Sequence, residues 1–251
     1  MIIPITFVVI IGTVVLYGFG SPFAARKLGV ADALPQGILF VGADRWARAT
    51  ALFLQEKGFR VLLVDTNREN TTAARMAGLR SHTGSVLSAY VLDEIDLGGV
   101  GRLFAVTPND WVNALAVHKF SPIFGRAACY QLSRGKGAAK KPELDKHLQG
   151  RWLFGAEVTY WTLQHGVSAG AVVKATKLSA EFDYASFSEY YGKAVIPMFI
   201  LSEAGVLLAI TADQTAKPQA GQTVISLVEE PKQEQEARQR AAETPADGGA
   251  G

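Results

Sequence analysis

The stretch ILFVGADRWARA, residues 38–49, carries the pattern that decides the fold. A short apolar run ends at a glycine, and small and apolar residues at helical spacing follow it. A dinucleotide-binding fingerprint has this order, with three glycines at the turn between its strand and its helix. Here Gly42 takes the first glycine place, Asp44 the second and Ala47 the third. The stretch therefore predicts the first strand, turn and helix of a Rossmann-like domain with an altered turn.

Strand and helix patterns alternate after this stretch, as far as residue 132. Such alternation predicts a parallel sheet with helices on both faces. Because crossovers between parallel strands are right-handed, we expect a doubly wound α/β sheet with strand order 3-2-1-4-5 over residues 35–134. The expected strands cover residues 37–42, 59–65, 80–84, 102–107 and 126–132, and the helices 45–58, 67–79, 85–97 and 109–120.

A second pattern begins at residue 151, after a glycine- and lysine-containing segment at 133–150 that we interpret as a domain boundary. Short strands separated by glycine-containing turns predict a small α+β domain over residues 151–230. Residues 231–251 are charged and poor in apolar residues, so we expect them to be disordered. The expected strands cover residues 151–155, 171–179, 193–201, 205–211 and 223–228, and the helices 158–166 and 183–192.

The first 27 residues are predicted to form a transmembrane helix. The run from Ile2 to Phe19 is almost continuously apolar, and about 20 such residues span the ~30 Å hydrocarbon core of a bilayer. Arg26 and Lys27 follow it, which by the positive-inside rule places the rest of the chain in the cytoplasm. A signal peptide, which has a basic start, and a core or interfacial helix are the alternatives.

The composition excludes some functional classes. Cys129 is the single cysteine, so the chain has no internal disulfide, and it lies in an apolar run typical of a buried residue. The net charge of +2 does not indicate a polyanionic partner. The basic run within residues 133–150 contains no aromatic residues for base stacking, so we expect no nucleic-acid binding.

Asp44 and Asp65 are the candidate residues on which nucleotide binding depends. Asp44 places a carboxylate where phosphates meet the helix N-terminus, although it could instead cap that helix. Arg45 and Arg48 follow it and could offset its charge. Asp65 ends the second strand near the offset of ~20 residues at which an acid binds the ribose of NAD. Capping of the next helix is its alternative role; for that cap Asn67 is also suited.

Known catalytic patterns are absent from the sequence. It has no GxSxG elbow and no phosphate-binding GxxxxGK[ST] loop. The histidines His82, His118, His147 and His165 lack metal-ligand spacing. The acidic cluster of residues 93–96 on a predicted helix is typical of a solvated face. We therefore expect no enzymatic activity and no metal site; a membrane-tethered NAD-dependent oxidoreductase is the enzyme alternative.

Three segments together resemble the RCK domain, also called the TrkA N-terminal domain, and more closely the cytoplasmic part of bacterial sodium/proton exchangers of the cation:proton antiporter type. They are residues 38–67, 73–88 and 96–125, and the last contains the distinctive TPNDWVNALA. The resemblance implies that Gly42 and Asp65 frame a nucleotide. It places Gly84 beside the adenine, with Ser85 in place of the usual acid, and Thr107 at the end of the fourth strand.

The resemblance also implies a function, which is regulation of cation/proton exchange by a cytosolic nucleotide. The expected ligand is NAD(H) or an adenine nucleotide, and a ligand-free structural or oligomerisation module is the alternative. The expected partners are the membrane, a second copy of the chain, and a transmembrane transport domain in the same full-length protein or on another chain. The expected location is the inner membrane of a bacterium, with the folded part in the cytoplasm.

Overall fold

The structure is a computed structural model that describes residues 6–7, 9–15, 35–135, 148–213 and 217–229. Contacts divide the chain into two compact units, Met1–Pro35 and Gln36–Gly251. Residues 6–7 and 9–15 of the first unit are helical with exposed side chains. Within the described residues, no helix has both the length and the apolar character needed to cross a membrane. Most of the helix predicted for residues 1–27, and the tail predicted at 231–251, lie outside the described residues.

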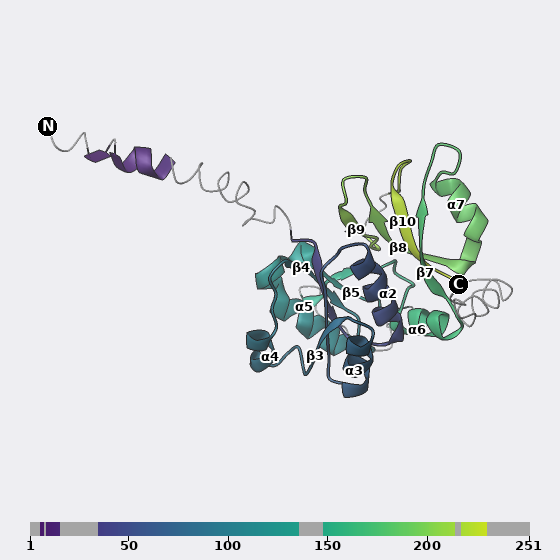
Figure 1. Ribbon diagram of the computed structural model, residues 1–251, viewed down its shortest axis with the longest axis horizontal. Helices are drawn as coiled ribbons and strands as arrows, with labels where there is room; N and C mark the ends of the chain where they lie inside the picture. Colours follow the sequence, from purple (N-terminus) through teal and green to yellow (C-terminus); the bar gives the residue numbers. More distant parts are fainter. Residues whose placement is uncertain (1–5, 8, 16–34, 136–147, 214–216, 230–251) are drawn as a thin grey trace, which may run out of the picture. The chain divides into compact units, whose positions relative to one another are not determined.

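A parallel sheet forms the first half of the second unit (Figure 1). Its strand order is β3-β2-β1-β4-β5-β6, so the predicted order of the first five strands is confirmed and a sixth strand extends it. The strands are β1 Gly37–Val41, β2 Val61–Asp65, β3 Arg80–Thr83, β4 Val100–Ala105, β5 Cys129–Gln131 and β6 Arg151–Trp152, and the helices are α2 Arg45–Glu56, α3 Arg68–Met76, α4 Ala89–Glu94 and α5 Asp110–Phe124.

The central strand β1 is buried along its whole length, as expected for a parallel strand covered on both faces. Because side chains alternate along a strand, Ile38 and Phe40 pack in one core cluster with residues of α2 and α3. Leu39 and Val41 pack in the other cluster with residues of α4 and α5. The sheet is therefore doubly wound, as predicted.

Three predicted elements differ from the structure. Residues 151–155 were assigned to the second domain, but β6 pairs parallel with β5 in the first sheet. The helix predicted at 85–97 is reduced to α4, because residues 85–88 form a turn in which the Ser88 N–H donates to the Ser85 carbonyl at 2.9 Å. The helix predicted to end at residue 120 continues to Phe124, with Pro122 in its last turn.

The second sheet is antiparallel, with strand order β7-β10-β8-β9. Helix α7 covers part of it, because Phe187 packs in one buried cluster with Leu178 and Val224. Both helices predicted in this region are present. The strands are β7 Val172–Lys177, β8 Val195–Leu201, β9 Leu207–Ala209 and β10 Thr223–Val228, the helices are α6 Tyr160–Ser168 and α7 Tyr184–Tyr191, and two short 3-10 helices cover Arg126–Ala128 and Gly192–Ala194.

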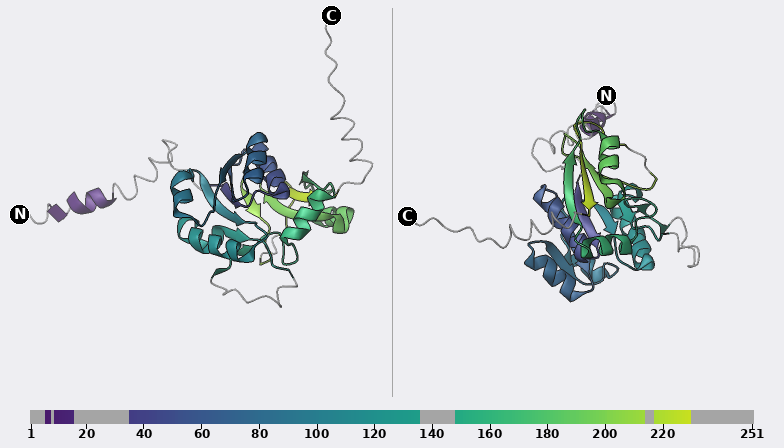
Figure 2. Two further views of the ribbon diagram at one scale, coloured as in Figure 1. Left: turned by 90° about the horizontal axis from the view of Figure 1, so that it is seen from below. Right: turned by 90° about the vertical axis from the view of Figure 1, so that its right-hand side faces the viewer.

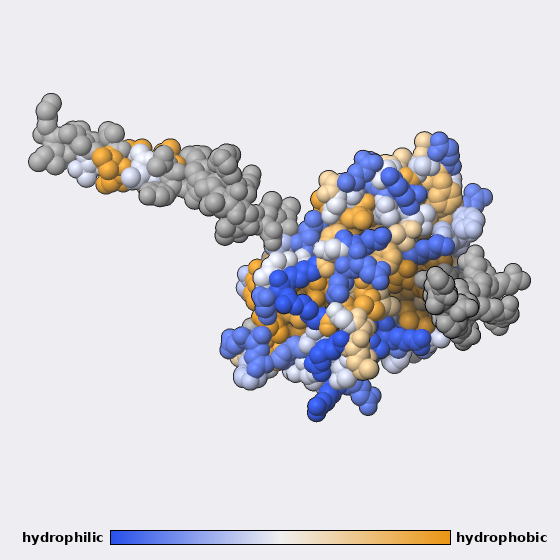
Figure 3. Space-filling model, in the orientation of Figure 1, coloured by the Kyte–Doolittle hydropathy of each residue, from blue (hydrophilic) through white to orange (hydrophobic). Residues whose placement is uncertain are grey.

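One hydrophobic core joins the two sheets, which lie side by side in Figures 1 and 2. The ring of Phe104 in β4 stacks on that of Phe199 in β8, with 5.8 Å between centroids. Phe40 and Tyr130 meet Phe104 edge-on, each at 5.3 Å. Hydrophilic residues are spread over the face seen in Figure 3, with apolar residues between them. The second sheet is thus attached through a buried aromatic cluster.

Replacing Phe199 tests this shared core. Phe199 is fully buried, so Phe199→Ala leaves a cavity between the sheets and lowers the free energy of unfolding by about 3–5 kcal/mol. The measurement is urea unfolding, in which the midpoint falls while a single transition is kept. Leu208→Ala in β9 is the control, because Leu208 is 48% exposed and its removal costs little. Separate transitions for the two sheets would contradict the shared core.

Candidate functional site

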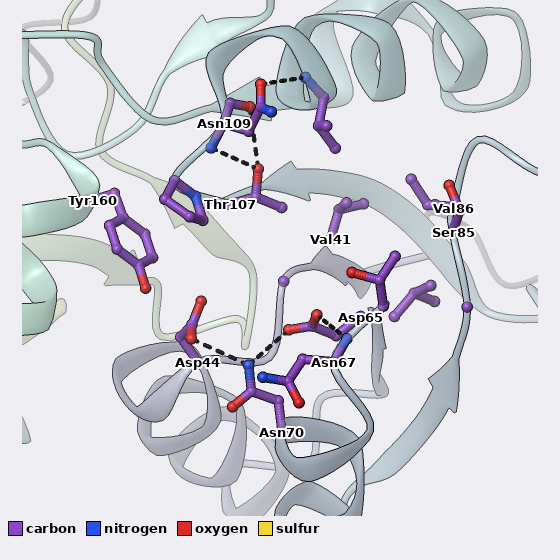
Figure 4. A pocket seen from close by; sticks show the side chains of 16 residues that line it. Val41, Asp44, Asp65, Asn67, Asn70, Ser85, Val86, Thr107, Asn109 and Tyr160 are labelled. Carbon is purple, nitrogen blue, oxygen red and sulfur yellow. Dashed lines mark hydrogen bonds between the residues drawn. The ribbon is translucent and has the colours of Figure 1, made fainter.

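A cavity of about 380 Å³ opens at the carboxyl ends of β1, β2, β3 and β4 (Figure 4). This edge is where doubly wound sheets bind their ligands. The cavity brings together six of the seven predicted site residues, from four different loops. Its lining consists of Val41, Gly42, Asp44, Val64, Asp65, Thr66, Asn67, Asn70, Gly84, Ser85, Val86, Thr107, Pro108, Asn109, Val112 and Tyr160.

Asp65 connects the loop after β1 with the loop after β2. Its Oδ2 atom accepts a hydrogen bond from the Ala43 N–H at 2.8 Å, and its Oδ1 atom accepts one from the Asn67 N–H at 2.8 Å. The Asn70 side chain donates to Oδ2 as well, at 3.1 Å. A carboxylate offers about four lone-pair positions, so Oδ1 retains one for a ligand. The capping role is taken by Asn67, whose side chain accepts from the Glu69 N–H at 2.8 Å.

Asp44 stands at the position before α2, but its side chain makes no capping hydrogen bond. The capping interpretation of Asp44 is therefore wrong. Its Oδ1 atom accepts a hydrogen bond from the Asn70 Nδ2 atom at 3.2 Å. Tyr160, from α6, lines the same cavity, and Figure 4 shows its hydroxyl turned toward the Asp44 carboxylate. Asp44 thus directs its charge into the cavity.

The pKa of Tyr160 reflects this environment. Burial raises the pKa of its phenol first, and the nearby Asp44 carboxylate raises it further. The charge of Asp65 acts in the same direction. The phenol is consequently protonated at neutral pH and adds no charge of its own to the cavity.

The two arginines near the turn do not face the cavity. Arg45 is exposed and is the predicted site residue that does not line it. The Arg48 Nη1 atom donates to the Ala43 carbonyl at 2.5 Å and to the Asn70 Oδ1 atom at 3.2 Å. Neither arginine therefore presents its guanidinium group in the lining of the cavity. The described lining contains two carboxylates and no lysine or arginine.

The loops after β3 and β4 complete the cavity wall. A Cβ atom on Gly84 would lie 2.9 Å from the Val91 Cγ2 atom, so this position has no room for a side chain. The Ser85 hydroxyl accepts from the Leu87 N–H at 3.3 Å and lies at the exposed rim. No metal-binding group of three or more His, Cys, Asp or Glu side chains occurs among the described residues.

The motif TPNDWVNALA has a structural explanation in the loop after β4. Asn113 is buried, and its Oδ1 atom accepts from the Thr107 N–H at 3.0 Å and from the Thr107 hydroxyl at 2.7 Å. Its Nδ2 atom donates to the Thr107 carbonyl at 2.9 Å. Asn109 caps α5 by accepting from the Trp111 N–H at 3.0 Å. These bonds fix Thr107 at the cavity and leave its hydroxyl already engaged.

Several lining residues were not predicted as site residues. Asn67 was expected only as a helix cap, and Asn70 lies one turn after it on α3. Both follow β2 directly, so the strand-end rule could have included them. Tyr160 comes from beyond the first sheet, in α6, and packing of α6 beside α2 brings it to the cavity. No local pattern of the sequence indicates that contact.

Comparisons with known proteins confirm the family resemblance for part of the chain. Residues 38–135, less than half of the chain, match the model of the TrkA-N domain family. No curated protein matches the chain.

Similar solved structures share little sequence with it. The NAD(P)-binding domain of an exopolyphosphatase-related protein from Archaeoglobus fulgidus is 14% identical over 42% of this chain and 79% of that chain, with a TM-score of 0.34. The TrkA-N domain of the inner membrane protein ybaL from Escherichia coli is 16% identical over 39% of this chain and 73% of that chain, with a TM-score of 0.34. The GsuK channel bound to NAD is 13% identical over 90% of this chain and 45% of that chain, with a TM-score of 0.39. Likenesses this low carry no functional argument.

Replacing Asp65 with asparagine tests its connection between the two loops. Each carboxylate oxygen accepts a backbone N–H, whereas an amide presents an NH₂ group to one of these donors. Asp65→Asn is therefore expected to lower the free energy of unfolding by about 1–3 kcal/mol, even without a ligand. Urea unfolding measures the loss, and Asp93→Asn on the exposed face of α4 is the control with little change. Equal stability of the two variants would refute the structural role of Asp65.

Proposed function

We propose that this chain, in which residues 38–135 match the TrkA-N domain family, is the ligand-sensing regulatory part of a monovalent cation/proton antiporter. The ligand is an adenine-containing compound, with NAD(H) and adenine nucleotides as the family candidates. In this proposal the folded part lies in the bacterial cytoplasm, attached to the inner membrane through the apolar run near the N-terminus. It acts as a homodimer on a transport domain of the same protein or of another chain.

The cavity at the strand ends is the observation that carries this proposal. It gathers Gly42, Asp65 and Gly84 at one edge of the sheet, which is where this fold class places a nucleotide. The open lone pair of Asp65 suits a ribose hydroxyl, and the apolar side chains Val64 and Val86 suit a base. Its volume of about 380 Å³ falls in the range of about 300–1,000 Å³ that small-molecule sites occupy.

The regulatory mechanism that we propose uses Tyr160 as the link between the cavity and the second sheet. Tyr160 lines the cavity from α6, and α6 residues Leu163 and Val167 pack in the core cluster that contains Phe199 of the second sheet. A ligand shifts an equilibrium only through different affinities for two states. A ligand in contact with Tyr160 binds more tightly to one position of α6, and the second sheet transmits that preference to the transporter.

Binding to the complete chain tests the sensing part. We expect isothermal titration calorimetry with a panel of adenosine, AMP, ATP, NAD⁺ and NADH to detect at least one saturable 1:1 complex. Ser85→Trp fills the rim of the cavity and abolishes that complex. Ser168→Trp, at the far end of α6, is the control that leaves it unchanged. Absence of binding by every compound of the panel would rule out the sensing proposal.

Transport measurements test the regulatory part. The measurement is proton release from everted membrane vesicles after addition of sodium or potassium. Vesicles from cells that carry Ser85→Trp in the native gene are compared with vesicles from cells that carry the unchanged gene. Coupling between sites is typically ~1–3 kcal/mol, so we expect the response of exchange to the bound ligand to change by about fivefold or more. Exchange that is identical in both vesicle preparations, with and without ligand, would contradict the proposal.

A further inference from the structure

We infer that Asp44 makes this cavity selective for a nucleoside without phosphate groups, such as adenosine, over nucleotides and dinucleotides. The inference rests on the proposed function, because it specifies which adenine compound the proposed site accepts.

A negative charge stands at the phosphate position of this cavity. In a Rossmann site the acid of the second strand holds the ribose, and the phosphates lie at the N-terminus of the first helix. With the ribose at Asp65, the 5′ end of the ligand points toward Asp44, whose carboxylate is turned into the cavity rather than capping α2. Lysine and arginine are absent from the described lining, so a phosphate would meet a negative charge without compensation.

A backbone donor of the phosphate turn is already in use. In the fingerprint the turn approaches the pyrophosphate through its backbone. Here the Ala43 N–H donates to the Asp65 Oδ2 atom at 2.8 Å. The Arg48 guanidinium, a natural phosphate partner, is held on the Ala43 carbonyl at 2.5 Å. A phosphate could use these two donors only by breaking both contacts.

Asp44 is held in place by its neighbours. Asn70 donates to its Oδ1 atom at 3.2 Å, and the Tyr160 hydroxyl is turned toward its carboxylate from another side of the cavity (Figure 4). Rotation of Asp44 away from a phosphate would break its hydrogen bond from Asn70. The carboxylate therefore remains in the cavity as a barrier to phosphate.

A nucleoside avoids these conflicts and uses the groups that remain. Its ribose hydroxyls are donors, and Asp65 and Asp44 present acceptors. Its base is apolar on both faces and fits the wall of Val64, Val86 and Val112. The cavity of about 380 Å³ lies at the small end of the range of about 300–1,000 Å³, as expected for a nucleoside rather than a dinucleotide. The adenosine half of NAD thus suits the site, whereas its pyrophosphate does not.

Calorimetry on the complete chain and its Asp44→Asn variant tests this selectivity, with adenosine, AMP and NAD⁺ as the probes. We expect the unchanged chain to bind adenosine at least about tenfold more tightly than AMP or NAD⁺. Asparagine keeps an acceptor for Asn70 but removes the charge, so Asp44→Asn should reduce that ratio by about tenfold or more, an effect of ~1.4 kcal/mol. Asp93→Asn, on exposed α4, is the matched control and should leave the ratio unchanged. Asp44→Ser is a second variant without the charge, and thermal unfolding shows which variants are folded.

The outcomes separate this inference from the proposed function. Tighter binding of AMP or NAD⁺ than of adenosine to the unchanged chain overturns the inference and leaves the proposed function standing. An unchanged ratio in both folded Asp44 variants also overturns the role of Asp44. Absence of binding by all three probes overturns the ligand class inferred here, and absence of binding by the whole adenine panel overturns the sensing proposal with it.

Discussion

The carboxylate of Asp65 holds together the two loops that shape the cavity. It accepts the backbone N–H groups of Ala43 and Asn67, each at 2.8 Å, and thereby joins the ends of β1 and β2. In a nucleotide-binding domain of this fold class the same acid serves the ligand. Here Asp65 uses most of its hydrogen-bond acceptor positions for groups of the protein itself. The negative charge that faces the expected ligand position is largely that of Asp44. The altered glycine turn is thus part of a closed hydrogen-bond arrangement rather than a damaged phosphate site.

Tyr160 gives this arrangement a connection to the rest of the unit. It enters the cavity from α6, whose residues Leu163 and Val167 share a core cluster with Phe104 and Phe199. Asp44 therefore lies beside a side chain of the helix whose apolar residues share a core cluster with both sheets. Interfaces of this kind are densely packed and shift between discrete arrangements rather than deforming gradually. This gives the proposed sensing domain a physical route from its ligand to its second sheet.

Much of the first sheet could be predicted from the sequence, because its signals are local. The apolar run of β1, the helical spacing in α2 and the cap at Asn67 each depend on neighbours within a few residues. The predictions failed where contacts between residues far apart in the sequence decide the structure. Strand β6 has only two residues, and it joins the first sheet because β5 offers it an edge. Helix α4 is short because residues 85–88 form a turn that helical periodicity does not reveal.

The sequence by itself determined which strand ends meet, and with them the position of Gly42, Asp65, Gly84 and Thr107 at one edge of the sheet. Parallel strands with right-handed crossovers allow no other arrangement of their carboxyl ends. Only the tertiary structure decided what Asp44 does. From the neighbouring sequence alone, an aspartate at this position is equally compatible with capping its helix and with facing the cavity. Its hydrogen-bond partner Asn70 comes from α3 and its neighbour in the cavity, Tyr160, comes from α6. The packing of these helices beside α2, which no local pattern encodes, turns the charge of Asp44 toward the cavity.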